Sequence, residues 1–249
     1  MQTRFSEIQM QDPAIAEAND ILRKCVHCGF CTATCPTYVT LGDELDSPRG
    51  RIYLIKEMLE GGKPATEATV RHLDRCLTCL SCTTTCPSGV DYMHLLDHGR
   101  QHIEQTYQRP LTDRWLRGLL KWLLPKPQMF RLALIGAKIA RPFAALFPGR
   151  LSAMLKMSGA SVSPPSPVDR PQIHEAISAR QMRVAMLSGC AQQVVGGDIN
   201  EATIRLLRRH GVEVVIAEGM ECCGALTQHM GADTAAHKSA RANISAWLT

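Results

Sequence analysis

Apolar residues recur at helical spacing through the first 110 residues of the chain. Ile15, Ala18 and Leu22 share one face of a predicted helix over residues 12–24, which Asp12 can cap. Similar spacing behind a capping residue predicts three further helices, over residues 47–61, 66–75 and 91–107. The first part of the chain is therefore expected to be helical.

The pattern changes in the second part of the chain. Residues 158–171 are too rich in serine and proline to hold a helix. Beyond them the apolar runs 183–188 and 212–217 predict buried strands, and the stretches 198–210 and 233–248 predict helices. Alternation of strands and helices implies a parallel sheet, in which ligands collect at the carboxyl ends of the strands.

Eight of the eleven cysteines form two copies of the pattern C-x-x-C-x-x-C-x-x-x-C-P. Three thiolates on one tight loop can reach three corners of a [4Fe–4S] cubane, whereas the fourth points elsewhere. In two-cluster ferredoxins, the fourth cysteine of each run binds the other cluster. The resemblance to them implies one cluster bound by Cys25, Cys28, Cys31 and Cys86, and a second bound by Cys76, Cys79, Cys82 and Cys35.

Two other uses of these cysteines are disfavoured. A structural zinc site takes four ligands from two C-x-x-C pairs, whereas each run here supplies four by itself. An odd number of cysteines and an N-terminus without the apolar core of a secretory signal disfavour a disulfide framework. We therefore expect reduced thiols and a cytoplasmic protein.

The three remaining cysteines follow the two predicted strands. Cys190 comes directly after the first, and Cys222 and Cys223 come shortly after the second, next to Gly224. A parallel sheet would bring all three to one edge, where they could hold a third cluster or a metal. The alternative is that they are three small buried apolar residues.

Charge limits the classes of partner. The formal net charge of +5 falls to about +1 when two oxidised cubanes of about −2 each are added, so net charge does not suggest nucleic-acid binding. Residues 109–156 carry ten Arg or Lys residues and one acid, Asp113, among many apolar side chains. Such a segment can lie on an anionic membrane, dock on a partner subunit, or form ordinary helices with solvated basic faces.

Three charged or titratable residues lie near the predicted ligands. Cations beside a cluster raise its potential, but Arg49 and Arg51 are expected to belong to a solvated basic face, since charged helix residues usually face water. His27 lies between two predicted ligands, and each iron already has a cysteine, so we expect it to support the site at most.

At this point the chain resembles a known family. The doubled cysteine run, the segment from Cys25 to Lys56, and the later elements S-G-C-A-Q and E-C-C-G-A are similar to those of glycolate oxidase iron–sulfur subunits. The resemblance implies an electron-transfer subunit without catalytic residues of its own. It also implies partner subunits that contain FAD and oxidise glycolate to glyoxylate, and an acceptor that is a quinone or another carrier, with the chain at the inner face of the cytoplasmic membrane as one location.

The resemblance has one departure. Family members carry two cysteine-rich domains, each closed by a further C-x-x-C, and the chain reaches Thr249 without either feature. We therefore expect a truncated form. The alternatives left open are a subunit of a lactate or anaerobic glycerol-3-phosphate dehydrogenase, a thiol or disulfide oxidoreductase that uses Cys190, Cys222 and Cys223, and a zinc-stabilised interaction module.

The expected fold class is mostly α with a C-terminal α/β part. Its predicted segments are an α-helical ferredoxin domain with two [4Fe–4S] clusters (1–108), a basic amphipathic helical segment (109–157), a Pro/Ser-rich linker (158–180) and an incomplete, parallel α/β cysteine-rich domain (181–249).

Overall fold

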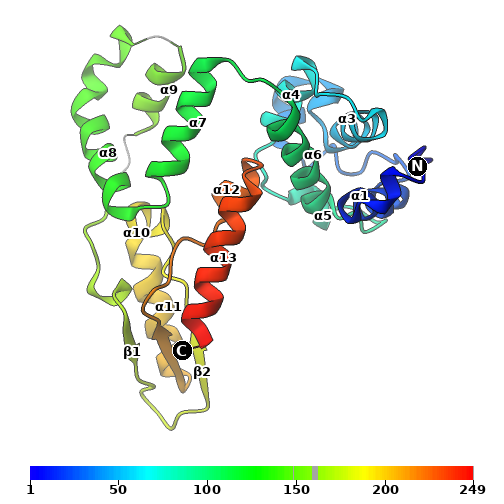
Figure 1. Cartoon of the computed structure of the whole chain (residues 1–249). Helices are drawn as coiled ribbons and strands as arrows, with labels where there is room; N and C mark the ends of the chain where they lie inside the picture. The colour runs from blue at the N-terminus through cyan, green and yellow to red at the C-terminus, as the bar shows by residue number, and fades with distance from the viewer. Residues whose placement is uncertain (148, 159–161, 249) are drawn as a thin grey trace. The chain divides into compact units, whose positions relative to one another are not determined.

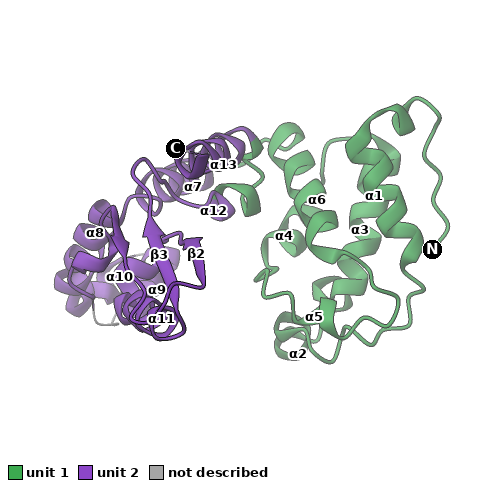
Figure 2. Cartoon of the chain, turned by 90° about the horizontal axis from the view of Figure 1, so that it is seen from below, with its two compact units in different colours: residues 1–109, 227–233 green, residues 110–226, 234–249 purple. Residues whose placement is uncertain are grey.

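Over the residues that the structure describes, the protein is mostly helical and has one small sheet, as the apolar pattern predicted. The structure is a computed structural model that describes residues 1–147, 149–158 and 162–248. Two compact units divide the chain: unit 1 holds residues 1–109 and 227–233, and unit 2 holds residues 110–226 and 234–249 (Figure 2). Residues 159–161 of the expected linker lie outside the described residues, and the expected four-segment division stays a prediction.

Unit 1 contains the helices that the sequence predicted. Side chains of Asp12, Ser47, Thr66 and Asp91 each accept a backbone N–H in the first turn of a helix, as N-caps do. Two short helices were not expected, because four to six residues are too few to show periodicity. The elements are η1 (Gln9–Gln11), α1 (Pro13–Lys24), α2 (Pro36–Leu41), η2 (Glu44–Asp46), α3 (Pro48–Gly61), α4 (Glu67–Asp74), α5 (Ser81–Thr84) and α6 (Tyr92–Thr106).

The core of unit 1 lies between α1, α3, α4 and α6 (Figure 1). Its completely buried side chains include Leu22, Ile55, Leu73, Leu95 and Ile103. The start of α3 packs tightly on η2, since a Cβ on Gly50 would lie 2.1 Å from the carbonyl oxygen of Glu44. This close approach fixes the backbone that leads from the first cysteine run into the core.

Unit 2 begins with helices that expose apolar side chains. Its first elements are α7 (Leu111–Leu123), α8 (Pro127–Ala140), η3 (Arg141–Leu146) and α9 (Gly149–Met157). Trp115, Ile139 and Phe143 are each at least 60% exposed. Among the described residues, no helix is both long and apolar enough to cross a bilayer. The three alternatives given for this segment stay open.

The sheet of unit 2 is mixed, with strand order β1-β3-β2. The two predicted strands pair in parallel, whereas β1 (Gln172–His174) pairs antiparallel with β3. The expectation of a purely parallel sheet is therefore wrong at β1. With three residues, of which only Ile173 is apolar, β1 is too short to show alternation. The other elements are β2 (Met182–Ala185), α10 (Gln192–Val195), α11 (Gly197–Arg209), β3 (Val212–Ile216), α12 (Ala225–His229) and α13 (Asp233–Leu248).

Candidate metal centre

The two cysteine loops of unit 1 share an unusual backbone. His27 and Thr78 take the same place in their runs, and both have left-handed φ values, of 56° and 54°. The position that follows the second cysteine is also left-handed in both loops, with φ of 85° at Gly29 and 57° at Leu80. Residues with a Cβ rarely adopt this conformation, and it persists where the surrounding structure demands it. The repeat in the sequence is therefore also a repeat in backbone geometry.

Two cavities collect the eight thiols. The first is an open cavity whose lining includes Cys25, Cys28, Cys31 and Cys86. The second is lined by Cys35, Cys76, Cys79 and Cys82. The cavities are adjacent, because Cys82, Pro48 and Tyr92 line both. Each lining thus includes three cysteines of one run and the fourth of the other, and the first cavity has Cys82 in its lining as a fifth.

The electrostatics of these thiols suit a metal. Burial and the neighbouring thiol of Cys76 raise the pKa of Cys82 to about 12, and burial also raises the pKa of Cys31. The opposite occurs at Cys79, where hydrogen bonds from Ser81 lower the pKa. Crowded thiols that repel one another's charge are stabilised as thiolates when a cation binds them. With Cys82 counted at the second cavity only, four thiols are left for each cavity, and four thiolates fit a [4Fe–4S] cluster.

His27 lines the first cavity without a hydrogen-bond partner for its buried Nε2 atom among the described residues. Burial lowers the pKa of the His27 imidazole. It is placed beside the thiols, as the sequence suggested.

A buried ion-pair network borders the second cavity. Asp46 is fully buried, and its carboxylate accepts hydrogen bonds from Arg51 Nη2 (3.3 Å), His72 Nδ1 (3.0 Å) and Arg75 Nη1 (2.8 Å). Burial raises the pKa of Asp46, but the hydrogen bonds from His72 and Arg75 outweigh it, and the net shift is downward.

Arg51 is 1% exposed, so its expected place on a solvated face is wrong. Asp46 supplies the buried counter-charge that makes this burial tolerable. The Nε atom of Arg51 donates to the carbonyl of His72, and its Nη1 atom donates to Cys35 Sγ at 3.8 Å. Arg49, by contrast, is about one-third exposed and pairs with Glu44.

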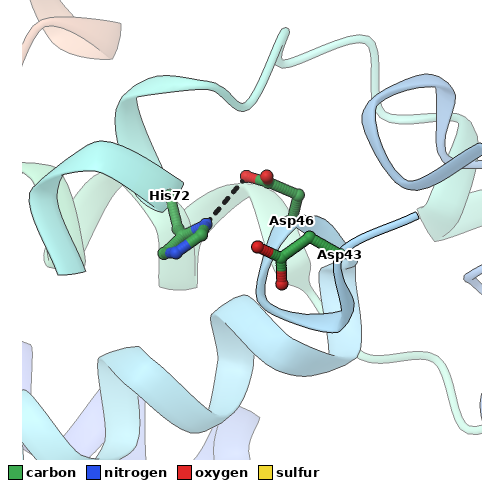
Figure 3. Close-up of side chains that lie close together, drawn as sticks. All are labelled: Asp43, Asp46 and His72. Atoms are coloured by element: carbon green, nitrogen blue, oxygen red, sulfur yellow. Dashed lines mark hydrogen bonds and ion pairs between the residues drawn. The ribbon is translucent and has the colours of Figure 1, made fainter. Parts of the chain in front are cut away.

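Asp43, Asp46 and His72 lie close enough together to suggest a cation site (Figure 3). However, both carboxylate oxygens of Asp46 already accept hydrogen bonds from guanidinium groups. Asp43 is exposed and uses Oδ1 to cap the backbone N–H of Leu45. An added cation would face the charges of Arg51 and Arg75, so this cluster is an ion-pair network rather than a metal site.

A second group of thiols lies in unit 2. Cys222 Sγ is 3.3 Å from Cys190 Sγ, and its hydrogen bond lowers the pKa of Cys190 to about 7 and raises that of Cys222. Cys223 follows on the same loop and is exposed, so the three are not simply buried apolar residues. The sequence predicted that Cys190, Cys222 and Cys223 would meet at one edge of the sheet, and the structure places the thiols of Cys190 and Cys222 in contact.

Asn243 holds this loop and carried no signal in the sequence. It is 3% exposed, accepts the backbone N–H of Glu221 at 2.9 Å and donates to the carbonyl of Cys222 at 3.2 Å. Gly224 has φ of 85°, and a Cβ there would lie 2.9 Å from the carbonyl oxygen of Ala236. Helix α13 therefore shapes the loop of Cys222 and Cys223.

Two segments of the chain match known protein families. Residues 21–90 match the family model of the 4Fe-4S dicluster domain, and residues 184–249 match that of the cysteine-rich domain. One segment of the chain is thus similar to a dicluster iron–sulfur domain, and a later segment is similar to a cysteine-rich domain.

The expected resemblance to the glycolate oxidase iron–sulfur subunit is confirmed. The chain is 47% identical over 99% of its length to the glycolate oxidase iron-sulfur subunit of Escherichia coli (strain K12), of which it covers 57%. It is 34% identical over 91% of its length to the probable glycolate oxidase iron-sulfur subunit of Bacillus subtilis (strain 168), of which it covers 54%. The chain therefore spans little more than half the length of these relatives. No solved structure matches it.

Proposed function

We propose that the chain is the iron–sulfur electron-transfer subunit of a glycolate oxidase. It would bind one [4Fe–4S] cluster through Cys25, Cys28, Cys31 and Cys86 and a second through Cys35, Cys76, Cys79 and Cys82. Each cluster, when bound, takes up and releases one electron at a time. The observation that carries the proposal is the gathering of eight thiols around two adjacent cavities that share Cys82, Pro48 and Tyr92 as walls.

The chain's own residues would position the thiolates and set their surroundings. The left-handed turns at His27 and Thr78 fold each C-x-x-C around its cavity, and α1, α3 and α6 hold the two loops together. No residue of the chain is assigned to substrate chemistry. The proposed partners are FAD-containing subunits that oxidise glycolate to glyoxylate, and a quinone or another carrier is the proposed acceptor, on the cytoplasmic side of the membrane.

Substitution of Cys28 tests the ligand sets. In purified Cys28→Ala chain, iron should fall from about eight to about four atoms per chain, since one cubane loses a corner. Glycolate-dependent quinone reduction by the assembled complex should be lost. Thr34→Ala, a change of an exposed residue in the same loop, is the control and should keep both properties. Full iron content in the Cys28 variant would contradict the assignment.

The exchange of the fourth cysteine needs a separate experiment. Cys35→Ala should change the paramagnetic resonance signal of the cluster that Cys79→Ala also changes, although Cys35 belongs to the other run. If Cys35→Ala and Cys28→Ala change the same signal, each run binds its own cluster and the exchange is wrong.

A second candidate function is favoured by the 3.3 Å separation of Cys190 and Cys222 and by the low pKa of Cys190. These thiols could exchange with a disulfide substrate, since a thiol with a pKa near 7 is substantially ionised at neutral pH. Oxidised glutathione should then convert the pair into a Cys190–Cys222 disulfide, detected by mass spectrometry as the loss of two hydrogens. Iron or zinc retained at these thiols under the same treatment would favour a metal site.

A further inference from the structure

The two thiol cavities of unit 1 differ in what surrounds the sulfur atoms. This inference rests on the proposed ligand sets and goes beyond them. Hydrogen bonds to cluster sulfurs and positive charges near a cluster stabilise its reduced, more negative state, and so raise its reduction potential. The donors and charges at each cavity therefore indicate which site holds an electron more strongly.

At the second cavity, two buried side chains face the thiols. Arg51 donates a hydrogen bond from Nη1 to Cys35 Sγ at 3.8 Å. The other nitrogens of Arg51 donate to Asp46, Thr37 and the carbonyl of His72. The hydroxyl group of Tyr92, which is 3% exposed, donates to Cys76 Sγ at 3.6 Å. Thr37 is not counted as a donor, because its hydroxyl proton goes to the carbonyl of Asp46 at 2.8 Å.

The charge network behind Arg51 adds to this effect. Arg51 and Arg75 share the single carboxylate of Asp46, but Arg75 is 44% exposed and solvent screens its charge, as it screens that of Arg49. The buried part of the network is the pair of Arg51 and Asp46, in which the guanidinium group of Arg51 is the side that contacts a thiol, Cys35 Sγ. Arg51 lies in a low-dielectric interior, where a charge acts more strongly on its neighbours than it would in water. An anionic group held by Cys35 would partly balance this charge.

At the first cavity, the donors that the described residues supply to sulfur are backbone amides. The N–H of Val90 donates to Cys86 Sγ at 3.5 Å, and the N–H of Arg49 faces Cys31. The positive groups near the first cavity stabilise a reduced cluster less than Arg51 does at the second. Arg49 is about one-third exposed and is neutralised by Glu44, and the N-terminal ammonium group of Met1 binds backbone carbonyls that include that of Cys25. Solvent screens such partly exposed charges.

We propose that the cluster site of Cys35, Cys76, Cys79 and Cys82 has the higher reduction potential of the two, and that Arg51 and Tyr92 are the positioning residues that raise it. An electron that enters the chain at the first site would pass to the second and stay there until the next carrier accepts it. The two sites, each of which takes ligands from both cysteine runs, would thus differ in role.

Redox titration of the full chain, followed by paramagnetic resonance, tests this proposal. The signal of the second site is identified as the one that Cys79→Ala changes, and it should appear at the higher potential. In Arg51→Gln, the ratio of reduced to oxidised second site, measured at the wild-type midpoint, should fall about tenfold, or by ~59 mV for one electron. Tyr92→Phe should move the same signal in the same direction, by about threefold. The first site should keep its midpoint in both variants.

Arg71→Gln is the matched control. It also removes one positive charge, from an exposed position on α4 next to His72, and should leave both midpoints unchanged. Arg51→Lys keeps the charge, so its second-site midpoint should lie between those of the wild type and Arg51→Gln. If Arg51→Gln does not fold, Tyr92→Phe and Arg51→Lys still decide the matter.

Three outcomes would overturn the proposal: a second site at the lower potential, equal midpoints, or folded variants that leave the second midpoint unchanged. Any of these would leave the proposed function intact, provided that iron content stays at about eight atoms per chain. A chain that binds no iron would instead refute the proposed function. Iron analysis of each variant therefore separates the two failures.

Discussion

Asp46 links three side chains beside the second thiol cavity, although it does not belong to the lining of that cavity. Its carboxylate binds Arg51 and His72 in the interior and Arg75 at the edge. Its burial, and that of Arg51, could not be read from the sequence. The partners come from separate helices, His72 lies 26 residues away, and a charged residue near a helix start is usually solvated.

Replacement of Asp46 should be costly. Asp46→Asn keeps the shape but leaves Arg51 buried without a counter-charge, so we expect the free energy of unfolding to fall by about 3 kcal/mol. Chemical denaturation at pH 7 measures this loss. Asp43→Asn, which changes an exposed carboxylate three residues earlier, should cost less than about 1 kcal/mol. Equal losses in the two variants would show that the buried pair contributes little.

The same residue predicts a dependence on pH. Because the folded pKa of Asp46 is lowered, its contribution to stability is present above the pKa of the unfolded chain and is lost as pH falls through the folded pKa. Wild-type stability should therefore decline more steeply than that of Asp46→Asn below about pH 4. Parallel declines in the two proteins would contradict this account.

Cys190 offers a second titration at the residue scale. In the reduced, metal-free chain, its alkylation by iodoacetamide should be half-maximal near pH 7, because the thiolate that reacts is stabilised by the S–H group of Cys222. Cys222→Ala removes this donor and should move the midpoint up toward the ordinary thiol value of about 8.5. Mass spectrometry of the labelled peptides gives both midpoints. An unchanged midpoint in Cys222→Ala would exclude the hydrogen bond as the cause of the low pKa of Cys190.

At the scale of elements, the helices of unit 1 follow from local signals. Caps and apolar spacing predicted α1, α3, α4 and α6 to within about two residues, since each starts at a side chain that can bind its own first turn. The short α2 and α5 and the strand β1 could not be predicted, because such elements are held by tertiary contacts rather than by periodicity. The close packing of α3 on η2 was also invisible in the sequence.

Substitution of Gly50 tests how closely α3 packs on η2. Gly50→Ala should lower the free energy of unfolding by about 2 kcal/mol, because the new methyl group would push α3 away from the backbone of Glu44 and Leu45. Gly61→Ala is the matched control at the other end of α3, where a Cβ meets nothing within 4 Å. It should be neutral or stabilising by up to about 1 kcal/mol. Thermal or chemical denaturation compares the two.

At the scale of the whole molecule, the grouping of the eight cysteines into two sets follows the repeat in the sequence. That part of the site was predictable because each run carries its ligands at fixed spacing, and the resemblance to two-cluster ferredoxins supplied the exchange of the fourth cysteine. The side chains that distinguish the two sets were not predictable. Arg51 and Tyr92 reach the second set only through the packing of α3 and α6.

Metal removal should affect the two units unequally. All eight predicted ligands belong to unit 1, and Cys25 and Cys82 are part of its apolar core. Iron chelation under reducing conditions should therefore speed amide hydrogen exchange in α1, α3 and α6 by about 100-fold, since ligand binding stabilises the folded state. Strand β3 and helix α11 should be unaffected. Equal acceleration in both units, read by mass spectrometry, would contradict this expectation.

The burial of Arg51 makes the proposed difference between the two sites robust to the ionic strength of the medium. Mobile ions screen Arg49, which is about one-third exposed, but do not reach a guanidinium group that is 1% exposed. Raising the salt concentration from 0.05 to about 0.5 M should therefore leave the effect of Arg51→Gln on the second midpoint nearly constant. A subunit built in this way would keep the direction of its electron flow fixed while the salt content of its surroundings varies.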